Sequence, residues 1–131
     1  MTEARSTNPF PNLEGYKNAN LAAFRKSGAP VVTPVWYVVL DDKLYVRTGV
    51  GSDKAKRIRN DPRVRLAPAT VRGKRIGPES EARARILGPG KEELVEKAMK
   101  LLRQRYKTMP IVDLFVGREE HAILELEPAE P

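Results

Sequence analysis

The sequence predicts a mainly β protein built as an antiparallel barrel, closed or partly open. We expect six strands, because short segments alternate apolar and polar residues and are separated by glycine, proline and aspartate. Only one long segment has the spacing of an amphipathic helix, and it comes late in the chain. Many short strands with one late helix are typical of a barrel. No linker or internal repeat divides the chain, so we expect one domain over residues 1–131.

The beginning of the chain predicts an arm and a hairpin. The polar, proline-bearing residues 1–12 predict a loose arm, followed by at most a short helical turn around residues 13–18. Residues 20–26 have the alternation of a first strand. Ser27-Gly28 predicts the hairpin turn that follows it.

The strand predicted over residues 30–40 is apolar on both faces. We expect one face to line the core and the other to be covered by a helix, a bound ring system or a second copy of the chain. Pro34 has no N–H for a sheet ladder, which predicts a kink or local unpairing at Thr33–Pro34. Such a break frees backbone groups to meet a ligand, and a barrel corner without a ligand explains it equally well.

Residues 43–66 predict a strand, a glycine-containing turn, a short helix and a second strand. The helix is expected to begin after Ser52, a good N-cap, and to end before Pro62. Its first N–H groups, the Lys54 ammonium and the hydroxyls of Ser52 and Thr48 are the donors of a phosphate-binding site. An ordinary capped surface helix with solvated cations is the alternative.

The remainder of the chain predicts a basic loop, two strands and the long helix. Residues 69–78 are a turn-rich connection of the kind that often touches a ligand. Strands are expected over residues 79–87 and 121–127, and the helix over residues 91–106, where an apolar stripe serves packing. The apolar segment 108–118 is expected to pack against the barrel or a neighbouring subunit.

The net charge of +7 comes from the middle of the chain. Residues 43–85 contain thirteen Lys/Arg and four Asp/Glu, whereas residues 1–42 are neutral and residues 86–131 have a net charge of −2. This distribution favours a phosphorylated small molecule or a polyanion as the partner. Tyr45 is the only aromatic residue in the basic segment, which disfavours single-stranded nucleic acid.

Several chemistries have no signal in the sequence. No apolar run has the length of a membrane span, the N-terminus lacks the core of a signal peptide, and there is no cysteine. We therefore expect a cytoplasmic protein with no membrane partner. There is no metal-ligand spacing and no nucleophile–base pair, so we expect no metal site and assign no catalytic side chain. His121, the only histidine, is expected at a strand edge or an interface.

Seven short motifs along the chain resemble those of a known protein family. In order they are FRKSGAPV (24–31), TPVW (33–36), LYVRT (44–48), SDKAKRIR (52–59), PRV (62–64), RG (72–73) and GP (77–78). Their order and spacing resemble the pyridoxamine 5'-phosphate oxidase-like split-barrel superfamily over about residues 19–128. The most similar branch is the small mycobacterial-type one that uses the deazaflavin coenzyme F420.

The resemblance implies a homodimeric, six-stranded antiparallel split β-barrel with one long helix and one or two short ones. Each of two clefts between the subunits would hold a cofactor. The residues that match the family's phosphate site are Thr48, Ser52 and Lys54, with Arg57 one turn further along the helix. The residues that would lie beside the tricyclic ring are Thr33, Val35 and Trp36, and those that would border the cleft are Arg72 and Gly77.

The function implied by this resemblance is an F420-dependent oxidoreductase that transfers a hydride between the deazaflavin and a small organic substrate. FMN is the alternative cofactor, on the same fold. Asp53 replaces the basic residue often found there in FMN-binding relatives, and the surplus positive charge suits the polyglutamate tail of F420. Two other classes stay open, which are a non-catalytic cofactor-binding protein and a small basic barrel that binds nucleic acid.

Overall fold

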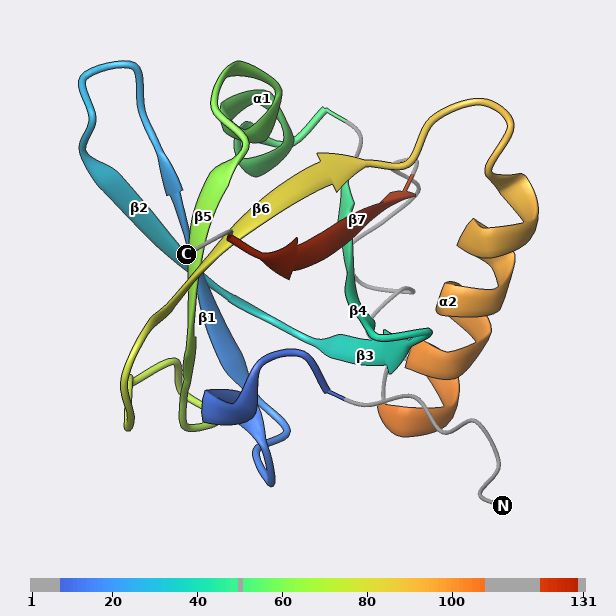
Figure 1. Ribbon diagram of the computed structural model, residues 1–131, viewed down its shortest axis with the longest axis horizontal. Coiled ribbons are helices and arrows are strands. Elements are labelled where there is room, and N and C mark those ends of the chain that lie inside the picture. The colour runs from blue at the N-terminus through green and yellow to red at the C-terminus, as the bar shows by residue number, and fades with distance from the viewer. Residues whose placement is uncertain (1–7, 50, 108–120, 130–131) are drawn as a thin grey trace.

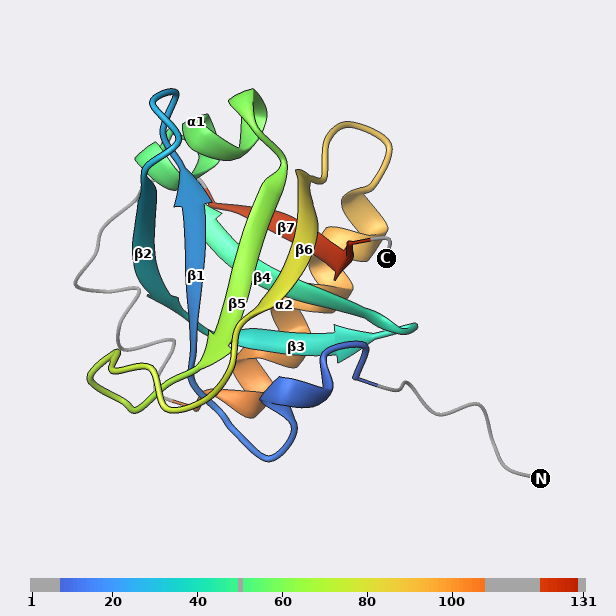
Figure 2. The same ribbon diagram turned by 60° about the vertical axis from the view of Figure 1, so that its left-hand side comes forward.

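Antiparallel strands form one curved sheet in this computed structural model, which describes residues 8–49, 51–107 and 121–129 (Figure 1). The strands are β1 (Ala19–Phe24), β2 (Pro30–Val35), β3 (Tyr37–Leu40), β4 (Lys43–Gly49), β5 (Arg63–Pro68), β6 (Ser80–Ile86) and β7 (His121–Pro128). Their order in the seven-stranded sheet is β2-β1-β5-β6-β7-β4-β3. The sheet folds over on itself into a half-barrel (Figure 2), and β2 and β3 are its two edges.

Two α-helices and a short 3-10 helix accompany the described strands. Helix α1 (Asp53–Asn60) contacts β1, β4 and β6, and helix α2 (Glu92–Arg105) packs against β3 and β7. The predicted boundaries of α1 are confirmed, since the Ser52 side chain accepts a hydrogen bond from the Ala55 N–H and the helix ends at Asp61, before Pro62. None of the helices among the described residues is both long and apolar enough to cross a bilayer.

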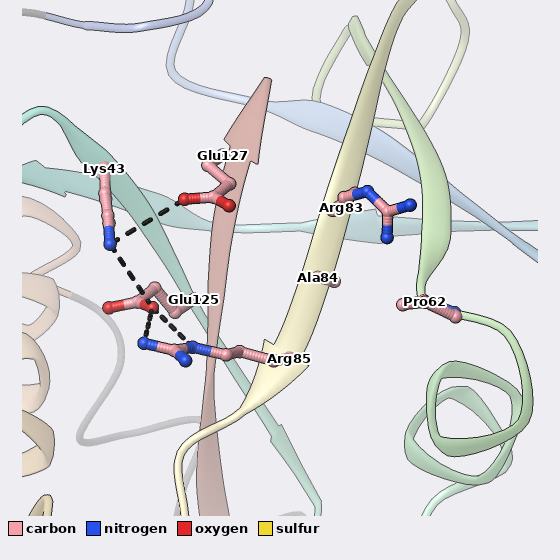
Figure 3. Close-up of a pocket in the computed structure, with 7 residues that line it drawn as sticks. All are labelled: Lys43, Pro62, Arg83, Ala84, Arg85, Glu125 and Glu127. Carbon is pink, nitrogen blue, oxygen red and sulfur yellow. Dashed lines mark hydrogen bonds and ion pairs between the residues drawn. The ribbon is translucent and has the colours of Figure 1, made fainter. Parts of the chain in front are cut away.

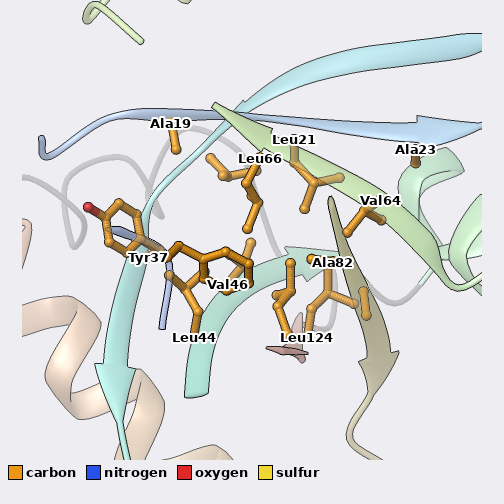
Figure 4. Packing of buried hydrophobic residues seen from close by; sticks show 14 of the residues in the cluster. Ala19, Leu21, Ala23, Tyr37, Leu44, Val46, Val64, Leu66, Ala82 and Leu124 are labelled. Atoms are coloured by element: carbon orange, nitrogen blue, oxygen red, sulfur yellow. The ribbon is translucent and has the colours of Figure 1, made fainter. Parts of the chain in front are cut away.

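The interior of the half-barrel is the main core. Side chains from β1, β4, β5, β6 and β7 point toward one another there, among them Leu21, Val46, Leu66, Ala82 and Leu124 (Figure 4). The period-2 alternation predicted for β5 and β6 is confirmed, with the arginines of both strands on the opposite face. A second cluster lies beneath α2 and contains residues of α2, β3, β4 and β7.

The strand predicted over residues 30–40 is two strands. Chain pairing changes at Trp36, because β2 pairs with β1 whereas β3 pairs with β4, and this gives seven strands where we expected six. The break expected at Thr33–Pro34 is wrong. Pro34 lies in register opposite Asn20 within β2, and an edge strand tolerates proline because its outer side needs no ladder donor.

The N-terminal segment also differs from the expected arm. The 3-10 helix η1 spans Pro11–Leu13, earlier than the turn predicted around residues 13–18. Phe10 and Leu13 are fully buried in the main core, and Asn12 donates hydrogen bonds from its side chain to the carbonyls of Leu66 and Pro78, at 3.0 and 2.9 Å. From residue 8 onward this segment therefore packs on the barrel. The predicted packing segment 108–118 lies outside the described residues.

Candidate functional site

The N-terminal turn of α1 brings two hydroxyls and an ammonium group to one end of β4. The Oγ1 atom of Thr48 lies 3.1 Å from the Oγ atom of Ser52, which itself accepts the Ala55 N–H at 3.1 Å. Thr48 is buried, and Lys54 in the first turn is half-buried. Helix N–H groups and hydroxyls in this arrangement suit an oxyanion.

The positive charge of Lys54 is not balanced by a partner among the described residues. Within the described part of the chain, no carboxylate lies within ion-pair distance of its ammonium and no hydrogen bond to it is formed. Burial lowers the pKa of Lys54 below its ordinary value of 10.5, with no neighbouring charge opposing the shift. A half-buried cation without a counter-ion is unfavourable in the folded protein, so an anionic ligand would relieve the cost.

Lys54 opens onto a cavity of about 350 Å³, which we call the α1 pocket. Its lining comes from the segment before β1, the β2–β3 junction, β4, α1 and the β5–β6 loop, and consists of Asn18, Pro34, Val35, Trp36, Arg47, Lys54 and Val71. This volume is within the lower part of the range of small-molecule sites, about 300–1,000 Å³. Two cations therefore share a pocket with an indole ring and aliphatic side chains.

The predicted site residues are distributed unevenly around this pocket. Val35, Trp36 and Lys54 line it, while Ser52 caps the helix turn that contains Lys54 and contacts Thr48 at the end of β4. Thr33 is two residues before Val35 on β2, and its buried hydroxyl has no hydrogen-bond partner in the described structure.

Besides Thr33, Thr48 and Ser52, three further predicted residues are not part of the lining. Arg57 is half-buried further along α1, and Arg72 is exposed in the β5–β6 loop. Gly77 lies against Pro68, where a Cβ atom added to the glycine would come within 2.6 Å of the Pro68 Cγ. The glycine is therefore required by the close approach of its backbone to the Pro68 ring.

Sequence reasoning did not assign four of the lining residues to the site, which are Asn18, Pro34, Arg47 and Val71. Arg47 follows Tyr45 at the two-residue spacing of β4, so the alternation alone places it on the outer face of the strand. The positions of Asn18 and Val71 had no such local signal. They reach the pocket through the folding of the loops before β1 and after β5.

A second cavity, of about 380 Å³, lies on the outer face of β4, β6 and β7 (Figure 3). Glu125, which is 6% exposed, accepts hydrogen bonds from the Tyr45 hydroxyl at 2.8 Å and from Arg85 Nε at 2.7 Å, and Lys43 lies 3.8 Å away. Burial favours the neutral acid, but the bonds from Tyr45 and Arg85 outweigh it and lower the pKa of Glu125. These charges satisfy one another, and none of the predicted site residues lines this cavity.

The comparisons with known proteins agree with this architecture. The family model for pyridoxamine 5'-phosphate oxidase matches residues 12–130. No curated protein matches the chain.

Solved structures share the fold at low sequence identity. The heme storage protein HutZ from Vibrio cholerae has a TM-score of 0.69 and 16% identity, covering 95% of this chain and 93% of that chain. An FAD-binding protein from Mesorhizobium loti has a TM-score of 0.65 and 18% identity, with 92% and 84% covered. A pyridoxamine 5'-phosphate oxidase-related, FMN-binding protein from Nostoc punctiforme has a TM-score of 0.62 and 14% identity, with 86% and 70% covered. Because the family model spans nearly the whole of this half-barrel, the chain belongs to the pyridoxamine 5'-phosphate oxidase-like split-barrel superfamily.

Proposed function

We propose that the protein binds a flavin-type cofactor, FMN in the first instance, in the α1 pocket and acts as an oxidoreductase on a small organic substrate. The observation that carries this proposal is the half-buried ammonium of Lys54, which has no counter-ion among the described residues and belongs to the helix turn that Ser52 caps, where the Ser52 hydroxyl meets that of Thr48. The FMN-binding protein from Nostoc punctiforme has the same fold, which supports a flavin as the ligand.

The residues of the pocket fit the two ends of such a cofactor. Lys54, Ser52 and Thr48 would hold the phosphate with charge-assisted hydrogen bonds. Val35 and Trp36 would form the wall beside the planar ring system and exclude water from it. When bound, the flavin supplies the hydride transfer, so the protein needs to bind, orient and shield it.

The distribution of ion pairs is the reason to place FMN before F420. The tail of F420 calls for free cations beyond the phosphate, yet Arg63 is paired with Asp61 at 2.8 Å, and Arg75 is 3.3 Å from Glu79. Part of the central positive charge is thus neutralised within the fold. F420 is the second candidate, because Arg47 adds a second cation to the α1 pocket beside Lys54.

A titration of the protein with oxidised and reduced FMN, and in parallel with oxidised and reduced F420, tests the assignment. We expect a coloured FMN complex whose reduced form is reoxidised by an added acceptor. Binding of F420 that is tighter than that of FMN, and that weakens more steeply with salt, would transfer the assignment to the deazaflavin. Tight binding without turnover by any acceptor would identify a cofactor carrier, and salt-dependent oligonucleotide binding without cofactor binding would reject the proposal.

We also propose that two copies of the chain associate through the outer face of β1 and β2. On this face Val32 is 53% exposed, and it lines a cavity of about 330 Å³ together with Asn20, Ala22 and Ala67 and with the ion-paired Arg75 and Glu79. Val32 lies on edge strand β2, whose outer side has no sheet partner among the described residues. An exposed apolar side chain on such a strand is a surface that a second copy can cover.

Light scattering at micromolar concentration tests this association. We expect the mass of a dimer for the wild-type chain and that of a monomer for Val32→Glu, with weaker FMN binding by the monomer because the α1 pocket adjoins the same edge strand. A wild-type monomer would overturn the proposed association.

A further inference from the structure

The hydroxyl of Tyr106, at the C-cap of α2, replaces a sheet partner at the β2–β3 junction. It accepts a hydrogen bond from the Tyr37 N–H at 3.1 Å and donates its single proton to the Lys17 carbonyl at 2.6 Å, while the Tyr37 carbonyl is a second, longer acceptor at 3.2 Å. Tyr37 follows Trp36, and Lys17 precedes Asn18. One side chain from α2 therefore anchors the backbone beside two residues that line the α1 pocket.

The ring of Tyr106 is also stacked on the indole of Trp36. The two ring centroids are 4.6 Å apart, and the planes differ by 6°. Tyr106 is 5% exposed, and burial raises its pKa, so the hydroxyl keeps its proton and remains a donor. The Arg105 guanidinium lies 5.5 Å from the centre of the same ring. These contacts hold the tyrosine ring, and the tyrosine ring in turn restricts the indole.

We infer that Tyr106 is a positioning residue for the cofactor: it fixes Trp36 as the rigid aromatic wall of the α1 pocket against which the planar ring of the flavin lies. This inference rests on the proposed binding of a flavin in that pocket. A wall that is ordered before binding loses little conformational entropy when the ring is bound, which favours affinity. Tyr106 acts through Trp36 and does not itself line the pocket.

Trp36 is the only tryptophan in the chain, so its fluorescence reports on this wall alone. We would measure its emission spectrum and anisotropy without ligand, and FMN affinity by quenching, in the wild type, Tyr106→Phe and Tyr106→Leu. Tyr106→Leu is expected to shift the emission, lower the anisotropy and weaken FMN binding by about three- to tenfold, the scale of a lost aromatic pair. Tyr106→Phe keeps the stacked ring and is expected to keep most of the affinity.

Tyr45→Leu is the matched control, because Tyr45 belongs to the same buried cluster beneath α2 but does not line the α1 pocket. It is expected to lower the unfolding temperature while leaving Trp36 anisotropy and FMN affinity unchanged. Wild-type Trp36 anisotropy and FMN affinity in Tyr106→Leu, or equal losses in Tyr45→Leu, would overturn the inference. Should the wild-type protein fail to bind FMN, the proposed function falls, and the ligand-free anisotropy still decides whether Tyr106 fixes Trp36.

Discussion

The hydroxyl oxygens of Thr48 and Ser52 lie 3.1 Å apart, which joins the end of β4 to the N-cap of α1. Ser52 also accepts the Ala55 N–H, so one hydroxyl both begins the helix and belongs to the proposed phosphate site. We expect Ser52→Ala to lower the free energy of unfolding by about 1 kcal/mol, the usual value of a lost N-cap, and to weaken FMN binding. Urea denaturation and FMN titration measure the two effects. Ser52→Thr keeps the acceptor and should retain most of the stability, and an unchanged midpoint in Ser52→Ala would contradict the prediction.

Lys54 is predicted to favour binding at the expense of stability. Lys54→Ala should weaken FMN binding by about 1–3 kcal/mol, the scale of a charge-assisted hydrogen bond partly open to water. Lys54→Met should do the same without lowering the free energy of unfolding, because the uncompensated ammonium is replaced by an apolar chain of similar length. Isothermal titration and chemical denaturation give both quantities.

Lys56→Ala is the control for this pair, since Lys56 is an exposed cation on the same helix. Its FMN affinity should stay within about 0.5 kcal/mol of the wild type, as expected for an exposed substitution. Unchanged affinity in Lys54→Ala would place the phosphate elsewhere, with Arg57 and Arg72 as the next candidates.

Glu125 is predicted to make stability depend on acidic pH. Its folded-state pKa is lower than the ordinary value of 4.5 because Tyr45 and Arg85 stabilise the carboxylate against the effect of burial. The unfolded chain therefore takes up this proton first as pH falls. The stabilisation is complete above about pH 4.5 and is lost between that value and the lower folded-state pKa.

The variant that tests this pH dependence is Glu125→Gln. At pH 7 it should lower the free energy of unfolding by about 1–3 kcal/mol, because the Arg85 guanidinium loses its buried negative partner and an amide NH2 group replaces one of the two acceptor oxygens. The difference from the wild type should shrink as pH is lowered through this window. Glu127→Gln is the control, since the Glu127 side chain is exposed and its ion pair with Lys43 is 3.7 Å long. A difference that stays constant from pH 7 to pH 3 would contradict the prediction.

Gly77 is predicted to be required for packing of the β5–β6 loop. Gly77→Ala should lower the free energy of unfolding by about 1–3 kcal/mol, because the new methyl group overlaps the Pro68 ring, which cannot rotate away. Gly88→Ala is the matched control, since nothing lies within 4 Å of a Cβ atom at that position. Thermal unfolding of the two variants should separate them clearly, and equal unfolding temperatures would refute the packing role.

The elements with local causes could be predicted from the sequence. The alternation of Arg63 and Arg65 with Val64 and Leu66 defined the two faces of β5, since side chains in a strand point to opposite faces in turn. The turn between β3 and β4 follows from Asp41-Asp42, where both residues adopt the positive φ that aspartate tolerates, 53° and 65°. Three of the residues that the resemblance names, Val35, Trp36 and Lys54, line one pocket in the structure.

The division of residues 30–40 into β2 and β3 was decided by the tertiary structure. Pro34 is the residue in this segment that breaks a ladder by its own chemistry, yet the pairing changes at Trp36. There the Tyr106 hydroxyl, 69 residues away from Tyr37 in sequence, satisfies the backbone at the junction. Backbone preferences act over a few neighbouring residues, whereas the place where a strand changes partner depends on which distant group can supply its hydrogen bond.

The α1 pocket likewise combines residues that follow from the local sequence with residues that only the tertiary structure brings together. The cap, the hydroxyls and the lysine of α1 follow from residues 48–54, because a helix N-terminus is built from consecutive residues. Asn18 and Val71 lie near each other because the start of β1 pairs with the end of β5, and the Ala69 N–H donates to the Asn18 carbonyl at 3.0 Å. The fold then places both beside Arg47 of β4 and Lys54 of α1 in the pocket. The sequence thus determined the chemistry at the start of α1, and the closing of the half-barrel determined which distant side chains surround it, since that closure depends on burial of the whole core.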